Sequence, residues 1–288
     1  MVPNWAHSSR RFDPAFESWN EWGSRRVPAF HGLIERRTAT LTISESDIRR
    51  VARYFRVPTL PEAFVLQAWH EFRLKARNVV FRSGQNEKAR GAYCAMRPDE
   101  FQHINARQAW ANWRTIPRSI NGRLPNSPIL ALDLCCGTGQ STSVMACYAA
   151  PHSELLGLEY NPNFVEAARR RAILNDRRAP ARARFHAQSV LETFCFQKGR
   201  MVPDRAADWV NSSGAVGCHF RPAETEKLAA EISRVLKPGG IATIDSGPDG
   251  TSTEELKDIF QRLGFTVLGQ TKSCALDRFT HVTFRRGV

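Results

Sequence analysis

The spacing of hydrophobic and polar residues changes near Ile129. Beyond it, short apolar runs typical of buried strands alternate with stretches of helical periodicity, which predicts a parallel sheet with crossover helices. Two final strands, separated by a short polar stretch, are expected to pair antiparallel. The expected strands are 129–135, 154–160, 183–188, 207–212, 241–245, 265–272 and 279–286, and the expected helices are 141–150, 164–175, 223–236 and 253–263.

The part of the chain before this sheet reads as mostly helical. Ser44 is followed by Asp47 and by apolar residues at helical spacing, which predicts a capped amphipathic helix. We expect two further helices, over 61–79 and 98–116, the second of which Pro117 closes. The N-terminal part should therefore form a helical layer beside the sheet.

Two segments flank these helices. Residues 1–40 carry scattered aromatic side chains among arginines and are predicted to wrap a folded body as an arm. Residues 118–128 are rich in Pro, Asn, Gly and Ser and are predicted to be a linker. We therefore expect two regions, 1–128 and 129–288, the first a helical cap or substrate region.

Three amides fall on one face of the third expected helix, at Asn105, Gln108 and Asn112. Such a row occurs on a solvated helix face, but it would also suit a hydrogen-bonding wall over a substrate pocket. Both interpretations stay open at this point.

The charge is concentrated in the first region. The chain has 41 Lys+Arg and 28 Asp+Glu, a net charge of +13. Residues 1–128 hold 21 basic and 11 acidic residues, net +10, whereas residues 129–288 hold 20 and 17, net +3. Six of the seven tryptophans also precede residue 129. The excess fits either an ordinary arginine-rich surface or a region that contacts an anionic partner.

The cysteines indicate the cellular compartment. Seven are present, with no C-x-x-C pair and no Cys/His spacing suited to zinc, so we predict no metal site. An odd number with one vicinal pair, Cys135 and Cys136, favours reduced thiols. Residues 1–26 lack the apolar core of a secretory signal, and no stretch is apolar enough to span a membrane. We therefore expect a soluble, cytoplasmic protein.

The strongest chemical signal lies where the first expected strand turns into a helix. The segment 132–142 reads Leu-Asp-Leu-Cys-Cys-Gly-Thr-Gly-Gln-Ser-Thr. Gly137 and Gly139 allow a tight bend and a close backbone approach to a ligand, and the helix that follows offers free N–H groups. Glu159 ends the next strand, where a carboxylate can accept hydrogen bonds from both ribose hydroxyls. A nucleoside-containing ligand fits this pair of features.

Residues 129–288 resemble the class I S-adenosylmethionine-dependent methyltransferases. The resemblance rests on four motifs in family order, at 132–139, 157–161, 208–213 and 234–240. It implies an α/β, Rossmann-like sheet of seven strands in the order 3-2-1-4-5-7-6, with the last strand antiparallel. It also implies S-adenosyl-L-methionine as the cofactor and S-adenosyl-L-homocysteine as the product.

The resemblance assigns roles to particular residues. Asp133 and the backbone of 135–139 would hold the methionine part of the cofactor, Glu159 the ribose, and the residues near Gln188 the adenine. The candidate cofactor-binding residues are Asp133, Cys135, Gly137, Thr138, Gly139, Thr142, Glu159, Tyr160, Gln188, Ser189, Asn211 and Ser212. Two of them depart from the family pattern, which often has Gly at position 135 and Asp near position 189.

A nicotinamide-dependent dehydrogenase is the structural competitor, because an acid at the end of the second strand also suits its dinucleotide. Its G-x-G-x-x-G fingerprint, read from Gly137, requires glycine at position 142, where this chain has threonine. The terminal strand pair also favours the methyltransferase.

The sequence says less about the methyl acceptor than about the cofactor. The segment 211–220 lacks the [Asp/Asn]-Pro-Pro-[Tyr/Phe] element used for amino nitrogens and the Pro-Cys nucleophile of pyrimidine enzymes, which weakens nucleic-acid base methylation. His219 follows the fourth strand and could take a proton from a hydroxyl, although a structural histidine fits as well. Tyr93, between two expected helices, is the second candidate catalytic residue and could form part of a lid.

Three functional hypotheses follow. The favoured one is methyl transfer to a small anionic or aromatic molecule, walled by the aromatic and arginine side chains of the first region. The second is RNA methylation, in which the same basic region binds phosphates and stacks bases. The third is a non-catalytic regulator that binds the cofactor.

Overall fold

The computed structural model describes residues 34, 39–76, 91–93, 95–177, 179–275 and 277–288. All of them belong to one compact unit that extends to Val288. Most of the expected N-terminal arm lies outside the described residues.

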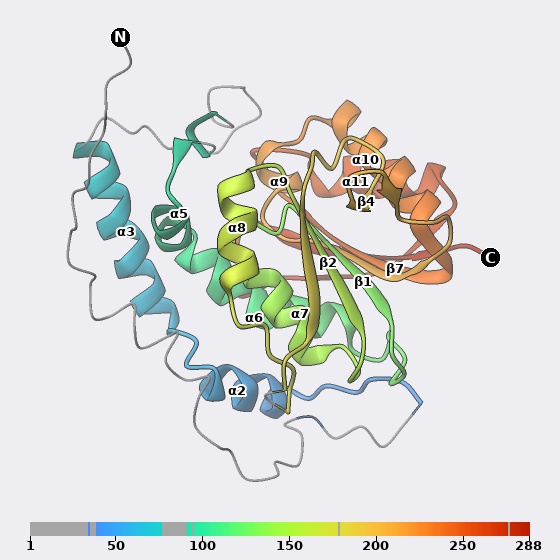
Figure 1. Ribbon diagram of the computed structural model, residues 1–288, viewed down its shortest axis with the longest axis horizontal. Coiled ribbons are helices and arrows are strands. Elements are labelled where there is room, and N and C mark those ends of the chain that lie inside the picture. The colour runs from blue at the N-terminus through green and yellow to red at the C-terminus, as the bar shows by residue number, and fades with distance from the viewer. Residues whose placement is uncertain (1–33, 35–38, 77–90, 94, 178, 276) are drawn as a thin grey trace. The chain divides into compact units, whose positions relative to one another are not determined.

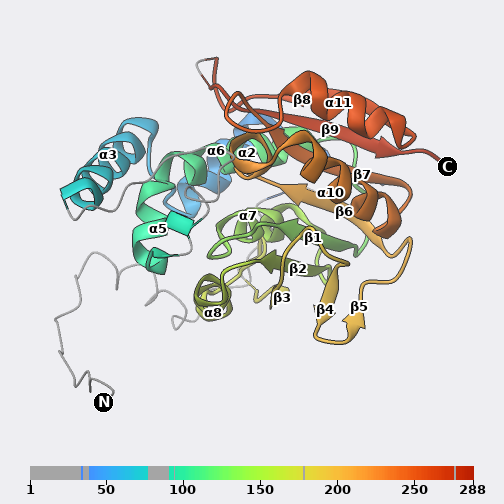
Figure 2. The ribbon, with the colours of Figure 1, turned by 90° about the horizontal axis from the view of Figure 1, so that it is seen from above.

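The central feature is a seven-stranded sheet in the order β3-β2-β1-β6-β7-β9-β8 (Figures 1 and 2). Strands β3, β2, β1, β6 and β7 are parallel, and β9 is antiparallel to both β7 and β8. Counted along the chain without the small hairpin below, this is the expected order 3-2-1-4-5-7-6 with an antiparallel last strand. The seven strands are β1 (Leu130–Leu134), β2 (Glu154–Glu159), β3 (Arg182–Ala187), β6 (Ala207–Ser212), β7 (Leu236–Ser246), β8 (Phe265–Thr271) and β9 (Thr280–Arg286).

Helices cover both faces of the sheet. One apolar cluster joins β1 and β2 to α7 (Gln140–Tyr148) and α8 (Pro162–Arg170). The other face packs against α10 (Pro222–Val235) and α11 (Thr253–Arg262). The core is therefore divided by the sheet into two layers of buried side chains. The short helix α9 (Val216–His219) follows β6 at the carboxyl ends of the parallel strands.

The N-terminal helices lie on the α7 side of the sheet (Figure 1). They are α2 (Glu45–Tyr54), α3 (Leu60–Ala76), α5 (Pro98–Ile104) and α6 (Ala106–Ile120). The predicted cap of α2 is present, because Ser44 Oγ accepts from Asp47 N at 3.1 Å and the Asp47 carboxylate accepts from Ser44 N at 3.0 Å. Helix α6 is the element that contacts both α3 and the sheet.

Two helix predictions near this region were wrong. The expected helix 98–116 is broken at Asn105, whose backbone leaves helical geometry and whose side chain donates to the Phe101 carbonyl at 2.8 Å. Pro117 does not close the second half, because α6 continues to Ile120. Burial of Ile116 and Ile120 in the core offsets the hydrogen bond that proline removes. The expected linker 118–128 accordingly begins inside a helix.

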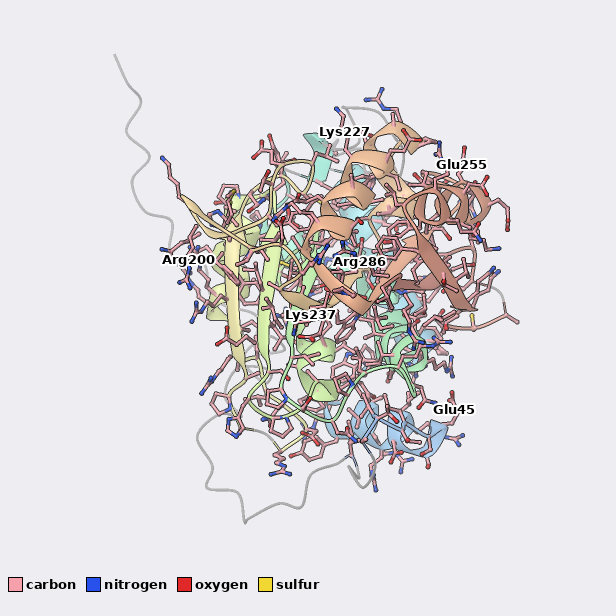
Figure 3. All side chains as sticks on the ribbon, turned by 90° about the vertical axis from the view of Figure 1, so that its right-hand side faces the viewer. Glu45, Arg200, Lys227, Lys237, Glu255 and Arg286 are labelled. Atoms are coloured by element: carbon pink, nitrogen blue, oxygen red, sulfur yellow. The ribbon has the colours of Figure 1, made fainter. Side chains whose placement is uncertain are left out.

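Two smaller differences complete the comparison. Helix α8 ends at Arg170, earlier than the expected Asn175. A two-stranded hairpin, β4 (Cys195–Gln197) with β5 (Arg200–Met201), follows β3 and was not expected. Figure 3 labels its Arg200 together with Lys227 of α10.

Candidate functional site

The glycine loop joins β1 to α7. Gly137 and Gly139 have φ of +54° and +81°, and Gly139 is the N-cap of α7. A Cβ on Gly137 would lie 2.6 Å from the Phe101 ring, and one on Gly139 would lie 3.3 Å from Ala168. The backbone angle therefore favours glycine at both positions, and the space beside Gly137 is also too small for a side chain unless Phe101 moves.

Cys135 begins the same loop with φ of +54°. This left-handed conformation is costly for a residue with a side chain, by about 1–2 kcal/mol. The methyltransferases that this chain resembles often have glycine at position 135. Here the left-handed turn is formed by cysteine, which is strained in that conformation.

Asp133 lies at the centre of a buried hydrogen-bond network. Its Oδ2 accepts from Ser141 Oγ and Thr142 Oγ1, each at 2.6 Å, and its Oδ1 accepts from Asn211 Nδ2 at 2.9 Å. Burial raises the pKa of the Asp133 carboxyl, and these three hydrogen bonds oppose that rise. The side chain is fully buried, so it ties β1, α7 and β6 together below the loop.

Asn211 and Ser212 are equally buried at the end of β6. Asn211 Oδ1 accepts from Thr243 Oγ1 at 2.9 Å, and Ser212 Oγ donates to Asp245 Oδ1 at 3.0 Å. Like Asp133, these side chains hold neighbouring strand ends in register rather than lining an open surface.

Glu159 stands at the end of β2 beside the glycine loop. Its Oε2 accepts from Gly137 N at 3.0 Å and its Oε1 accepts from Asn161 N at 2.9 Å. Burial raises the pKa of the Glu159 carboxyl, while these backbone N–H groups lower it. The carboxylate thus connects the two strand-end loops. Tyr160, the next residue, is 68% exposed.

Gln188 and Ser189 follow β3 on the other side of Glu159. Gln188 N donates to the Glu159 carbonyl at 2.9 Å, and Gln188 Oε1 accepts from Cys195 N at 2.8 Å. Ser189 Oγ accepts from Leu191 N at 3.2 Å. Both residues are half-buried in the turn that leaves β3.

Thr138 carries a polar atom that the other loop residues do not satisfy. Its hydroxyl is buried and makes no hydrogen bond within the described part of the chain. Its carbonyl accepts from Arg171 Nε at 2.8 Å, a contact that the sequence did not suggest. An unsatisfied buried hydroxyl next to a glycine loop is a group that a bound ligand could satisfy.

The two candidate catalytic residues are in contact. The rings of Tyr93 and His219 meet edge to face, with centroids 4.8 Å apart. Burial, followed by the nearby Cys218, raises the pKa of Tyr93 well above its ordinary value, so the phenol stays protonated at neutral pH. Tyr93 also meets Phe101 at 5.8 Å, and Phe101 packs on Phe164 of α8 at 4.3 Å.

Phe101 is the residue near the site that sequence reasoning missed. It lies against Gly137 and joins the N-terminal helices to the glycine loop. Its one signal in the sequence was its place on the amide-bearing face of the third expected helix, with Asn105 one turn on.

The amide row is used within the protein. Gln108 Nε2 donates to Asn112 Oδ1 at 2.7 Å, and a Cβ on Gly214 would lie 2.9 Å from the Gln108 side chain. Because Gly214 follows β6, Gln108 packs against a strand-end loop, whereas Asn105 lies at the break between α5 and α6 and so is not on the same helix.

Within the described ranges, no group of three or more His, Cys, Asp or Glu could hold a metal ion. No helix in the same ranges is both long and apolar enough to cross a bilayer. The cytoplasmic location expected from the sequence stays a prediction.

The comparisons with known proteins agree with this geometry. Residues 131–240 match the family model described as a methyltransferase domain. A demethylmenaquinone methyltransferase of Symbiobacterium thermophilum is 26% identical over 146 residues, which cover 49% of this chain and 51% of that protein. An uncharacterized methyltransferase of Synechocystis is 34% identical over 110 residues, which cover 38% and 43%.

Among solved structures, a TehB-like methyltransferase of Corynebacterium glutamicum matches with a TM-score of 0.44 and 19% identity, covering 59% of this chain and 85% of that one. The match of residues 131–240 to a methyltransferase domain agrees with the resemblance of this region to the class I S-adenosylmethionine-dependent methyltransferases. The chain spans about half the length of the curated relatives it matches.

Proposed function

We propose that this protein transfers the methyl group of S-adenosyl-L-methionine to a small-molecule acceptor. The observation that carries the proposal is the Glu159 carboxylate, held by backbone N–H groups beside a glycine loop at adjacent strand ends. A carboxylate beside a glycine loop that opens a helix is the arrangement that a nucleoside with an amino-acid tail requires. We also propose that 1–128 acts as a cap on a cofactor-binding region, 129–288.

The residues at the strand ends fit this cofactor. The backbone of the glycine loop would contact its methionine part, Glu159 its ribose, and Gln188 with Ser189 its adenine, while the buried Thr138 hydroxyl would become accessible only if the loop moved. Asp133, being fully buried, would act by holding the loop in place rather than by touching the ligand. The bound cofactor would supply an activated methyl group with a good leaving group.

The protein would then align the acceptor and exclude water. The aromatic contacts from Tyr93 through Phe101 to Phe164 support this role, because they bring apolar rings from the N-terminal helices to the glycine loop. His219 would accept the proton that a hydroxyl acceptor loses. Tyr93, protonated and in contact with His219, would orient the imidazole or donate to the acceptor.

The acceptor class is inferred from the same contacts. An aromatic metabolite would suit the rings of Tyr93 and Phe101, and an anionic one would suit the net positive charge of residues 1–128. The name of the Symbiobacterium relative points to a quinone acceptor for that protein and is compatible with an aromatic acceptor here.

Calorimetry with S-adenosyl-L-homocysteine tests the cofactor part. We expect the wild-type protein to bind it, and Glu159→Gln to weaken binding by at least about tenfold, because an amide cannot accept from both backbone N–H groups. Glu154→Gln, at the start of the same strand, is the matched control and should bind normally. Absence of binding by the wild-type protein, or equal affinity for both variants, would refute the assignment.

Methyl transfer must then be measured with metabolite panels and with RNA. Transfer to a small molecule supports the proposal, and transfer to RNA alone would replace it with RNA methylation. Cofactor binding without methyl transfer to any acceptor would favour the hypothesis that the protein is a non-catalytic regulator.

A further inference from the structure

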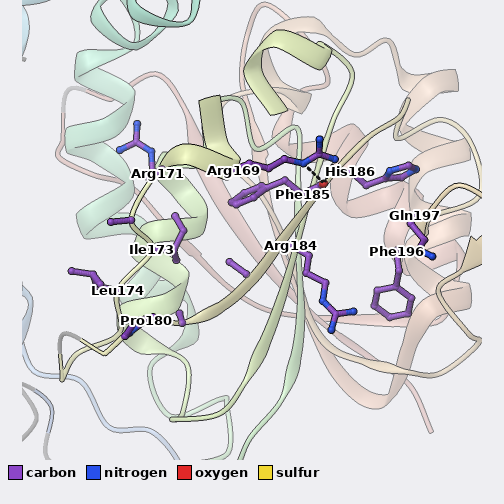
Figure 4. A pocket seen from close by; sticks show the side chains of 13 residues that line it. Arg169, Arg171, Ile173, Leu174, Pro180, Arg184, Phe185, His186, Phe196 and Gln197 are labelled. Atoms are coloured by element: carbon purple, nitrogen blue, oxygen red, sulfur yellow. Dashed lines mark hydrogen bonds between the residues drawn. The ribbon is translucent and has the colours of Figure 1, made fainter. Parts of the chain in front are cut away.

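A basic hollow lies along β3, the strand at one end of the sheet. Its volume is about 550 Å³, and it extends from the segment after α8 to the β4 hairpin (Figure 4). We define the basic hollow by six of the residues that line it, Arg169, Arg171, Arg184, His186, Phe196 and Gln197. Neither Tyr93 nor His219 lines it.

The basic hollow carries positive charge with little compensation. Three arginines line it, and no Asp or Glu is among its described lining residues. Arg169 is 3.8 Å from Glu166, but no ion pair among the described residues includes Arg171 or Arg184. The exposed Arg177 and Arg182 lie close along the chain. A partner of negative charge is therefore favoured.

The pKa shifts of His186 and Arg171 are consistent with positive charge that no nearby carboxylate balances. The pKa of His186 is lowered by burial and by the charge of Arg169. Burial lowers the pKa of Arg171 to about 10, and no carboxylate reverses this shift. A bound anion would relieve both effects.

The cations are spread along the basic hollow instead of meeting at one point. Figure 4 shows Arg171 at one end, beside Ile173, and Arg184 at the other, beside Phe196. A single phosphate is usually gripped by converging donors. Cations that are distributed along a groove suit a chain of anions.

Phe196 adds an aromatic surface to this end of the basic hollow. Its ring is half-buried, and the guanidinium of Arg200 lies 5.4 Å from the ring centroid. An aromatic ring beside cations is the arrangement on which nucleobases stack. A membrane surface fits less well, since it requires protruding apolar side chains rather than a concave site.

We propose that the basic hollow binds single-stranded nucleic acid, with phosphates on Arg169 and Arg184 and a base stacked on Phe196. The inference goes beyond the proposed function, because the strand bound there need not be the methyl acceptor. It also differs from the hypothesis that the N-terminal region carries RNA binding, since all these residues follow residue 128.

The test measures binding of the full chain to a fluorescent oligouridine RNA of about 12 nucleotides. The affinity should fall steeply as salt rises from about 50 to 200 mM. Arg184→Gln should weaken binding several-fold and reduce the slope of log affinity against log salt by about 0.7. Lys227→Gln, which removes an exposed cation from α10 (Figure 3), is the matched control and should change neither the affinity nor the slope.

Phe196→Leu tests the stacking separately, because leucine keeps the apolar packing of this half-buried position. We expect about tenfold weaker binding with an unchanged salt slope. Thermal unfolding and S-adenosyl-L-homocysteine binding of each variant should match the wild type, which separates this inference from the proposed function.

Three results would overturn the inference. The first is that the protein does not bind RNA at low salt. The second is that the wild type and Arg184→Gln bind RNA with equal affinity. The third is that poly-glutamate binds as tightly as RNA and that Phe196→Leu does not weaken this binding. The last result would indicate an acidic protein as the partner.

Discussion

Cys135 shows how a single backbone angle bears on the site. It opens the glycine loop at φ +54°, whereas Cys195 of β4 is among the residues with ordinary negative φ. We expect Cys135→Gly to raise the free energy of unfolding by up to about 1 kcal/mol, because the relief of left-handed strain exceeds the chain entropy that glycine adds.

Urea denaturation measures this difference, and Cys195→Gly is its control. Glycine at position 195 relieves no strain and should lower stability by about 0.5–1 kcal/mol. Equal losses in both variants would contradict the strain at Cys135.

His219 and Tyr93 offer a second test at the residue scale. If His219 accepts the acceptor's proton, His219→Gln should lower kcat by about 10²–10⁴ and remove the acidic limb of the pH–rate profile. Tyr93→Phe keeps the ring contact with His219 and should shift that limb without abolishing it. Comparable loss in both variants with an unchanged pH profile would indicate that the pair only packs.

The residues of the glycine loop and Glu159 were predictable, because each follows directly from its neighbours in the chain. Phe101 was not, because its contact with Gly137 joins segments 36 positions apart and depends on how the N-terminal helices pack. The hydrogen bond from Asn211 to Asp133 could not be predicted for the same reason, since Asn211 belongs to a distant strand, β6.

At the scale of elements, one ion pair fastens α2 to α6. Arg118 donates from Nε to Glu45 Oε1 at 2.6 Å and from Nη2 to Oε2 at 2.9 Å. These hydrogen bonds from Arg118 are the main cause of the lowered pKa of Glu45. A lowered folded-state pKa stabilises the protein above the unfolded pKa, and this contribution disappears as pH falls through the folded value.

We therefore expect Glu45→Gln to lower stability by up to about 1 kcal/mol at pH 7, and by much less below about pH 4. The pair is partly exposed, which keeps the effect small. Urea denaturation at both pH values measures it, with Glu154→Gln as the control. A loss of the same size at both pH values would mean that the charge of Glu45 plays no part.

Long elements were predictable and short ones were not. The sheet strands combine several apolar residues with flanking turns, so their positions and directions followed from the pattern, whereas their order was implied by the family resemblance. Strands β4 and β5 are only three and two residues long, too short to show a period. The break at Asn105 and the continuation through Pro117 depend on packing around α6, which overrides local propensity.

At the scale of the whole molecule, α6 connects the N-terminal helices to the sheet. Ala106, Trp110 and Ala111 pack with Ala63 of α3, while Ile116 belongs to the cluster beneath the sheet. One helix thus contributes to two cores. This arrangement predicts that the described helices and the sheet unfold together.

We expect Ile116→Ala to lower the free energy of unfolding by about 2–5 kcal/mol, because it removes a fully buried side chain. Tryptophan fluorescence and far-UV circular dichroism should both shift to the same new midpoint. Two separate transitions would show that the N-terminal helices fold independently of the sheet.

The contact between Arg169 and the end strand has a consequence for self-association. Arg169 donates to the Phe185 carbonyl from Nη2 at 2.9 Å and from Nε at 3.3 Å, which occupies a main-chain acceptor in the terminal strand β3. The neighbouring guanidinium groups would also repel an identical strand. Two copies of the protein are therefore discouraged from joining their sheets edge to edge, and this strand is protected against fibril-like growth.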